Sequence, residues 1–266
     1  GFMKKKIAII IPCYKAKGKV GQFINNLIRV FSQIDHKCDF LIYLVDDYCP
    51  LESWREAINL EGVRIIHHSF NRGVGASTMT GFKAALDEDN DFFIKMDADG
   101  QHPSEYLLEL VPYLLSLSPH KLCIVKGSRF SLHVKKQKVP FLRRFGSFVL
   151  EPLARLSLSY KGITDIANGF ISFNKITIEY LVSNRFKTQI KNRFLFESSV
   201  LTACSNLGAD VHEFYMHSVY GSKWTSSMNT IEMIIPILCF WLKSIFSRIF
   251  LKYFSSLNFG SLLLIS

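Results

Sequence analysis

Short apolar runs alternate with amphipathic stretches through the first half of the 266-residue chain. The apolar runs have the length and the β-branched content of buried strands. The stretches between them repeat apolar residues every three or four positions, as helices with one buried face do. This pattern predicts strands at residues 7–11, 40–45, 63–67, 92–96 and 122–126. It predicts helices at residues 20–31 and 106–117, and a third helix that includes residues 84–86.

Strands that alternate with helices predict an α/β fold with a mostly parallel sheet and helices on both faces. Ligands of such sheets bind outside the carboxyl ends of the strands. Asp46 and Asp47 follow the second predicted strand, and Asp97 and Asp99 follow the fourth. The sequence therefore predicts an acidic site at this edge of the sheet.

The alternation weakens after residue 130, where Lys135–Arg144 forms a basic stretch, and a second α/β segment is expected at 163–220. The strongly apolar run that follows is too short before Lys243 to span a membrane. Continued as a helix, it places Lys243, Arg248 and Lys252 opposite a face rich in Phe. That pattern is typical of a helix that lies in the membrane interface, although such a helix can also pack on its own protein. We expect a catalytic domain at 1–228 and a membrane-associating segment at 229–266.

The charge balance of the chain limits the classes of molecule that it is expected to bind. Lys and Arg exceed Asp and Glu by 32 to 22, which favours anionic partners such as nucleotide phosphates or an acidic membrane surface. Nucleic acid is not expected, because no helix-turn-helix, zinc or stacking-aromatic pattern accompanies the charge. The six Cys are scattered, and Lys4–Lys6 leads directly into a strand rather than a signal peptide, so we expect a cytoplasmic protein.

The most informative segment is Met96–Pro103, where two carboxylates stand two positions apart at the end of a strand. Such a pair suits Mg²⁺ or Mn²⁺ and leaves coordination positions for diphosphate oxygens. An isolated match of this kind is common in turns. Here it comes after three other polar strand-end turns, at Ile11–Tyr14, Val45–Asp47 and Asn71–Ala76.

Two further features accompany these turns. The loop with Gly73 and Gly75 opens a helix, so its backbone N–H groups are expected to face an anion. It lacks the third Gly of a dinucleotide-binding loop. His102 follows the acidic pair and is a candidate to position that loop.

With these motifs in order, the chain resembles family 2 glycosyltransferases of the GT-A fold, in the branch of dolichol-phosphate mannose synthase and bacterial polyprenyl-phosphate glycosyltransferases. The resemblance covers about residues 5–225 and is strongest at Asp97–Pro103. Further matches are Gly127–Phe130, Asp165–Phe170, Phe196–Ser198 and Gly221–Lys223. The chain departs from the family at Lys15-Ala16, Tyr48-Cys49 and Val219-Tyr220, where Asn-Glu, Gly-Ser and an Arg are usual.

The resemblance implies a role for each matching residue. The base and ribose of the donor would contact Pro12, Tyr14 and Asp46 or Asp47, and the donor-binding residues would also include Asn71, Gly73 and Ala98. The metal would lie among Asp97, Asp99 and Gln101. Donor or acceptor phosphates would contact Arg129, Arg143 or Arg144, and Lys223, while Asp165 and Glu197 would be the acidic catalytic residues on the acceptor side.

The function expected from this resemblance is metal-dependent, inverting transfer of a sugar from a UDP- or GDP-sugar to a membrane-linked acceptor, at the cytoplasmic face of the membrane. A polyprenyl phosphate is the expected acceptor. It is largely ionised at neutral pH, since the second pKa of a phosphomonoester is about 6, and the basic stretch Lys135–Arg144 is a candidate to hold it. One alternative is transfer to a saccharide hydroxyl in surface polysaccharide assembly, which needs a general base. A nucleotidyltransferase is a further alternative, but Pro12–Gly18 only faintly resembles the Gly-rich basic loop of such enzymes.

Overall fold

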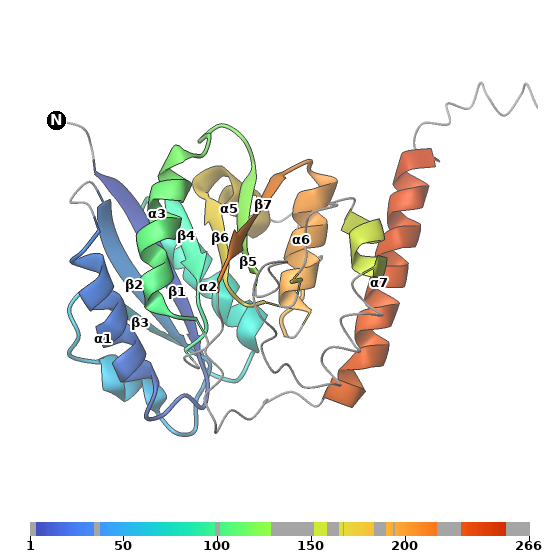
Figure 1. Cartoon of the computed structure of the whole chain (residues 1–266). Helices are drawn as coiled ribbons and strands as arrows, with labels where there is room; N and C mark the ends of the chain where they lie inside the picture. Colours follow the sequence, from blue (N-terminus) through green and yellow to red (C-terminus); the bar gives the residue numbers. More distant parts are fainter. Residues whose placement is uncertain are drawn as a thin grey trace, which may run out of the picture.

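The computed structural model describes residues 4–34, 38–98, 102–128, 152–158, 165–166, 168–183, 190–193, 195–216 and 230–253, with the side chains of the last segment described for 235–250. Helices cover both faces of a central sheet in this part of the chain (Figure 1). The α/β architecture expected from the alternating pattern is therefore confirmed.

The sheet has seven strands in the order β3-β2-β1-β4-β6-β5-β7. Only β6 runs antiparallel to its neighbours, β4 and β5, so the sheet is mixed and mostly parallel. The first five strands lie where the apolar runs predict them. The strands are β1 (Lys5–Cys13), β2 (Cys38–Asp46), β3 (Val63–His67), β4 (Phe92–Lys95), β5 (Cys123–Ser128), β6 (Ile171–Asn174) and β7 (Asp210–Tyr215).

Two hydrophobic clusters lie on opposite faces of the sheet. In β1, Ile7, Ile9 and Ile11 belong to one cluster, and Ala8 and Ile10 belong to the other. Because successive side chains of a strand point to opposite faces, a strand buried on both faces is apolar at every position. The helices are α1 (Val20–Phe31), α2 (Val74–Asp87), α3 (Leu107–Ser116), α5 (Lys175–Val182), α6 (Phe196–Asn206) and α7 (Thr230–Tyr253), with short 3₁₀ turns η1 (Ser53–Ala57) and η2 (Ser104–Tyr106).

α7 packs along the domain beside α6 and the helical residues 152–158 (Figure 1). Its Trp241 is 2% exposed and joins the hydrophobic cluster of α2 and α6. Arg248 Nη1 donates to the Ser157 carbonyl at 2.6 Å and to Ser205 Oγ at 3.0 Å. A residue of the predicted basic face therefore points into the protein.

The Phe-rich face of α7 points away from the domain. Phe246 and Phe250 are 69% and 62% exposed, and Leu242 and Ile249 are exposed as well. The helix is thus amphipathic as predicted, but it does not pack on its own protein through its Phe face. Within the described ranges, none of the helices combines the length and the hydropathy needed to cross a membrane. The side chain of Lys252 and the basic stretch Lys135–Arg144 lie outside the described part of the chain.

Candidate active site

The carboxyl ends of β1, β2 and β4 meet at one edge of the sheet. Cys13 pairs with Asp46, and Ile10 pairs with Lys95. These parallel registers place the turns after the three strands next to one another. The predicted grouping of Pro12, Asp46 and Asp97 at this edge is therefore what the topology produces.

A buried lysine joins the metal motif to α6. Lys95, the last residue of β4, is completely buried. Its Nζ lies 2.7 Å from Asp97 Oδ1 and 3.1 Å from Glu197 Oε1, and it donates to the Gly169 carbonyl at 3.1 Å. A buried ammonium is stable when it is paired and hydrogen-bonded in this way. One cation thus holds together a predicted metal ligand and a predicted catalytic acid.

The electrostatics of this cluster favour the ionised forms of Asp97 and Lys95. Burial raises the pKa of Asp97, but the charge of Lys95 and its hydrogen bond outweigh burial, and the pKa falls below its ordinary value. Burial lowers the pKa of Lys95, but the negative charges of Asp97 and Glu197 raise it by a larger amount. The pKa therefore lies above its ordinary value. The site therefore contains a buried ion-pair network at neutral pH.

His102 holds the backbone of the metal motif. The Asp97 amide donates to His102 Nδ1 at 3.2 Å, and His102 Nε2 lies 3.0 Å from Asn168 Oδ1. Lys126, which is also fully buried, donates to the Asn168 carbonyl. The expectation that His102 positions the loop agrees with these contacts.

The neighbouring residue, Gly169, leaves room for the carboxylate. A Cβ at Gly169 would lie 2.0 Å from Asp97 Oδ2 and 2.9 Å from Lys95 Nζ. Only a glycine therefore lets this backbone approach the pair. Asp165 is buried a few residues upstream, and its carbonyl accepts from the Asn168 amide at 3.4 Å.

Asp97 fits the role of a metal ligand, because its carboxylate oxygens suit a hard divalent cation. Its side chain is 33% exposed at the sheet edge. The two other predicted ligands, Asp99 and Gln101, lie outside the described residues. Within the part that is described, there is no group of three or more His, Cys, Asp and Glu able to hold a metal. The metal site stays a prediction.

Asp47 binds the glycine loop of its own chain. Its carboxylate accepts from the Arg72 amide at 2.8 Å, the Gly73 amide at 2.7 Å and Asn71 Nδ2 at 2.9 Å. His68 Nδ1 lies 2.8 Å from the same carboxylate. Burial raises the pKa of Asp47, but these hydrogen bonds lower it more, so the pKa is below its ordinary value.

The amides at the start of α2 are also occupied. Gly75 N and Ala76 N donate to the Asn192 carbonyl at 2.8 and 3.2 Å. The loop therefore faces an anion, but that anion is Asp47, and the amides of Gly75 and Ala76 are capped by the Asn192 carbonyl. The expectation that these amides are open to an external anion is wrong for the amides of Gly73, Gly75 and Ala76.

Asp46 faces a cavity of about 480 Å³, which it lines with Tyr48, Trp54 and His67. Asp46 Oδ1 accepts from the Cys49 amide at 3.1 Å, and Oδ2 lies 3.2 Å from His67 Nδ1. Tyr14 is exposed after β1, Pro12 is half-buried, and Ala98 is buried beside Asp97. The two neighbouring aspartates thus differ: Asp46 borders a cavity, and Asp47 points into the loop.

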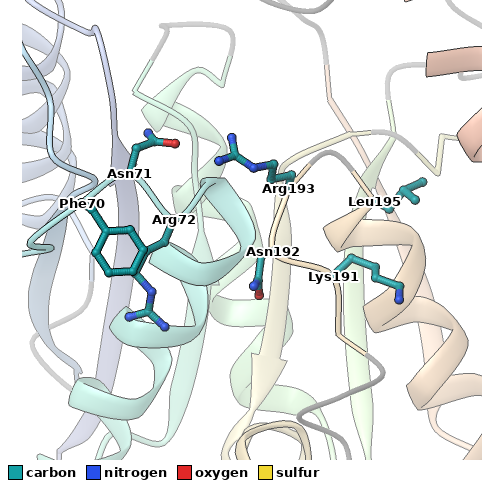
Figure 2. A pocket seen from close by; sticks show the side chains of 7 residues that line it. All are labelled: Phe70, Asn71, Arg72, Lys191, Asn192, Arg193 and Leu195. Atoms are coloured by element: carbon teal, nitrogen blue, oxygen red, sulfur yellow. The ribbon is translucent and has the colours of Figure 1, made fainter. Parts of the chain in front are cut away.

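A larger cavity, of about 660 Å³, lies between the loop before α2 and the segment before α6 (Figure 2). Its lining comes from Phe70–Arg72, Lys191–Arg193 and Leu195. Of these, only Asn71 is expected from the sequence as a site residue. Arg72 belongs to the Asn71–Ala76 turn but has no expected role there, and residues 70 and 191–195 carry no motif, because they meet the turn only through the fold.

Lys95 and Lys126 are also missed by the sequence motifs. The available signal is that each is a lysine within an otherwise apolar strand, which requires a buried partner. The predicted phosphate-binding residues Arg129, Arg143, Arg144 and Lys223 lie outside the described residues. Their roles stay predictions.

The chain matches known proteins both in sequence and in structure. A sequence model described as "Glycosyl transferase family 2" matches residues 8–151. The chain is 27% identical over 247 residues to the dolichol-phosphate mannosyltransferase of Pyrococcus furiosus, covering 85% of this chain and 66% of the relative. It therefore spans slightly less than two thirds of that protein. It is also 27% identical over 204 residues to the UDP-N-acetylglucosamine–dolichyl-phosphate N-acetylglucosaminyltransferase of Methanococcus voltae, covering 69% of this chain and 77% of the relative.

Among solved structures, glucosyl-3-phosphoglycerate synthase from Mycobacterium tuberculosis in complex with UDP superposes with a TM-score of 0.65. The identity is 14%, and the match covers 91% of this chain and 80% of the synthase. Other structures of that synthase contain Mn²⁺ or Mg²⁺ together with UDP. At this identity the likeness establishes the fold.

Proposed function

The chain belongs to glycosyl transferase family 2, and from this premise we propose that it transfers a sugar from a UDP- or GDP-sugar to a polyprenyl phosphate, with inversion at the anomeric carbon. The observation that carries the proposal is the position of Asp97 at the strand edge, joined through buried Lys95 to Glu197. The names of the two curated relatives, which both include a dolichol phosphate, support the choice of acceptor.

The donor is proposed to lie along the ends of β1, β2 and β4. Tyr14, which is exposed, and Asp46, which lines a cavity, would contact its base and ribose, whereas Asp47 would act by fixing the adjacent loop. Asp97, with Asp99 and Gln101, would hold Mg²⁺ or Mn²⁺ near the diphosphate. When bound, the cation offsets the negative charge that develops on the leaving diphosphate. Lys95 and His102 fix the side chain and backbone of Asp97 for that task.

A phosphate acceptor suits the state of the two candidate acids. An acceptor hydroxyl needs a general base within reach, but Asp165 is buried and one Glu197 oxygen is engaged by Lys95. A phosphomonoester needs no such base, because it is ionised at neutral pH. It needs positive charge instead, and Arg129, Arg143, Arg144 and Lys223 remain the proposed contacts from the family resemblance.

Membrane association is part of the same proposal. The Phe face of α7 exposes large apolar side chains to water, and insertion into a bilayer interface would bury them. Docking of that face on the cytoplasmic side of a membrane would place the enzyme where a polyprenyl phosphate is presented. We therefore propose peripheral attachment through α7.

The test is an assay of the purified chain with a panel of UDP- and GDP-sugars, Mn²⁺ or Mg²⁺, and undecaprenyl phosphate. The expected product is an acid-labile lipid-phosphate sugar, and excess EDTA should prevent its formation. A glycosidic bond to another sugar as the product would overturn the proposed acceptor.

The variant Asp97→Asn should lose both turnover and Mn²⁺ binding measured by calorimetry. The matched control is Asp87→Asn, which alters an exposed carboxylate at the end of α2. Full turnover by Asp97→Asn, or by the unaltered chain in EDTA, would contradict the metal-dependent mechanism.

A further inference from the structure

A chain of hydrogen bonds connects the backbones of two distant segments at the candidate site. The Phe170 amide donates to Asn168 Oδ1 at 3.1 Å, and His102 Nε2 lies 3.0 Å from the same oxygen. On the other side of the imidazole ring, His102 Nδ1 accepts from the Asp97 amide at 3.2 Å. The hydrogen bonds therefore run from the segment before β6 to the predicted metal ligand after β4.

The two ends of this chain fix the direction of every hydrogen bond in it. A backbone N–H can only donate, so the Asn168 atom that receives the Phe170 amide is the side-chain oxygen. That oxygen can only accept, so His102 Nε2 must carry a proton. At the other end, the Asp97 amide also can only donate, so Nδ1 carries no proton. The contacts thus require the neutral tautomer of His102 that is protonated at Nε2.

The surroundings hold both side chains in this arrangement. Asn168 and His102 are 1% and 5% exposed. The buried Lys126 donates to the Asn168 carbonyl, and the Phe170 carbonyl accepts from the Gly127 amide at 2.9 Å. The His102 ring packs edge to face on Phe170, with 5.5 Å between the ring centroids. A reversed amide or ring would leave a buried donor without an acceptor, which is costly in free energy.

From these contacts we infer that Asn168 is a positioning residue for Asp97. It fixes His102 in the tautomer protonated at Nε2, and this tautomer supplies the acceptor that holds the Asp97 backbone. The inference rests on the proposed function, because it takes Asp97 as a metal ligand. The sequence match at Asp165–Phe170 contains Asn168 but assigns no role to it.

The first test determines the tautomer of His102 in the unaltered full chain. The chain is labelled with ¹⁵N-histidine and measured by NMR at mildly alkaline pH, where an ordinary imidazole is neutral. Loss of a signal pair in His102→Phe assigns the two nitrogens. We expect a protonated Nε2 and an unprotonated Nδ1. A proton on Nδ1, or a mixture of the two tautomers, would overturn the inference.

The second test measures Mn²⁺ binding to Asn168→Leu by calorimetry. Leucine has a similar volume but offers no acceptor to His102. Mn²⁺ binding should weaken about three- to tenfold, as expected for the loss of one hydrogen bond. The NMR spectrum should show a mixture of His102 tautomers. Unchanged Mn²⁺ affinity in the folded variant would contradict the inference.

The matched control is Asn90→Leu, which removes another buried amide. Asn90 is 3% exposed and precedes β4, at the end of the strand opposite to Asp97. Its Nδ2 donates to Tyr43 Oη at 2.9 Å and to the Ala85 carbonyl at 2.8 Å. Asn90→Leu should lower stability as Asn168→Leu does, but it should leave the His102 tautomer and the Mn²⁺ affinity unchanged. Equal weakening of Mn²⁺ binding by both variants would show a general loss of stability and overturn the inference.

A double-variant cycle tests whether Asn168 acts through His102. His102→Phe keeps a ring at this position and removes both nitrogens, so it should weaken Mn²⁺ binding by a similar factor. Adding Asn168→Leu to His102→Phe should weaken binding by less than about a further twofold. The same factor in both backgrounds would mean that Asn168 acts independently of His102 and would refute the inference. If Asn168→Leu does not fold, the shorter Asn168→Ser replaces it in each measurement.

The two kinds of failure are distinguishable. If the unaltered chain binds no Mn²⁺, the metal-dependent function fails, and the NMR spectra still decide whether Asn168 fixes His102. If Mn²⁺ binds but its affinity does not depend on Asn168, the positioning role fails and the proposed function stands.

Discussion

Lys95 occupies a position in β4 that is otherwise apolar, and its charge is balanced by carboxylates from two different parts of the chain. Removing the ammonium leaves Asp97 and Glu197 close together without the cation that bridges them. Breaking a buried ion pair in this way costs about 3–5 kcal/mol. We expect Lys95→Met to lower the free energy of unfolding by that amount, measured by urea denaturation.

The control for this change is Lys83→Met, at an exposed lysine of α2. It should alter the free energy of unfolding by less than about 0.5 kcal/mol. The double variant Lys95→Met/Glu197→Gln should recover part of the loss, because it removes one uncompensated charge. Equal stability of Lys95→Met and Lys83→Met would show that the buried network does not hold the site together.

Hydrogen bonds in the folded protein stabilise the ionised carboxylate of Asp47, so its pKa is lower in the folded state than in the unfolded state. This stabilisation is present above the unfolded pKa of about 3.9 and is lost as pH falls through the folded pKa. Asp47→Asn should therefore destabilise the protein by about 1–3 kcal/mol at pH 7. The difference from the unaltered chain should shrink below about pH 4.

Urea unfolding of both proteins between pH 7 and pH 3 measures this effect. Asp87→Asn, which alters an exposed carboxylate, should leave stability nearly unchanged over the same range. A difference between Asp47→Asn and the unaltered chain that persists undiminished at pH 3 would argue against the carboxylate as its source.

Among the elements, α7 carries aromatic side chains that differ in burial. Trp241 is buried in the cluster with α6, whereas Phe246 is mostly exposed. Removing a buried large aromatic side chain costs about 3–5 kcal/mol, and surface changes cost about 0.5 kcal/mol or less. Trp241→Ala should therefore destabilise the protein strongly and Phe246→Ala should not.

Thermal and urea unfolding of the two alanine variants provide the measurement. Similar stabilities would mean that α7 does not pack on the domain through Trp241. The packing also means that α7 is part of the folded domain in this structure, although the sequence places a boundary at residue 228. Point variants are consequently better tests of its surface than truncation, because truncation would uncover the α6 cluster.

For the whole molecule, the exposed face of α7 predicts attachment to membranes. Burial of a large apolar side chain contributes about 1.5–3 kcal/mol, so Phe246→Ser/Phe250→Ser should weaken binding to anionic vesicles at least tenfold. Co-sedimentation with vesicles of phosphatidylglycerol and phosphatidylcholine measures it. The control Leu51→Ser/Ile58→Ser removes two exposed apolar side chains elsewhere and should sediment like the unaltered chain. If both variants sediment with vesicles to the same extent, α7 is not the surface that attaches the protein to the membrane.

The α/β class, the first five strands and the acidic edge were predictable from the sequence for a local reason. A strand buried on both faces must be apolar throughout, as residues 7–11 are, and polar residues can follow only where it ends. The same logic places Asp46 and Asp97 at one edge, because parallel strands end on the same side of a sheet. The family resemblance then rests on the residues at that edge.

The tertiary structure alone decided what surrounds each of these side chains. Asp46 and Asp47 are adjacent and chemically identical, yet one borders a cavity and the other is engaged by amides some 25 residues later in the chain. The pairing of Lys95 with Glu197 and the capping of the Gly75 amide by the Asn192 carbonyl also join segments more than 100 residues apart in sequence. Hydrophobic periodicity specifies which face of an element is buried, but it carries no information about which distant segment packs there, so these contacts follow only from the packing of α2 and α6 on the sheet.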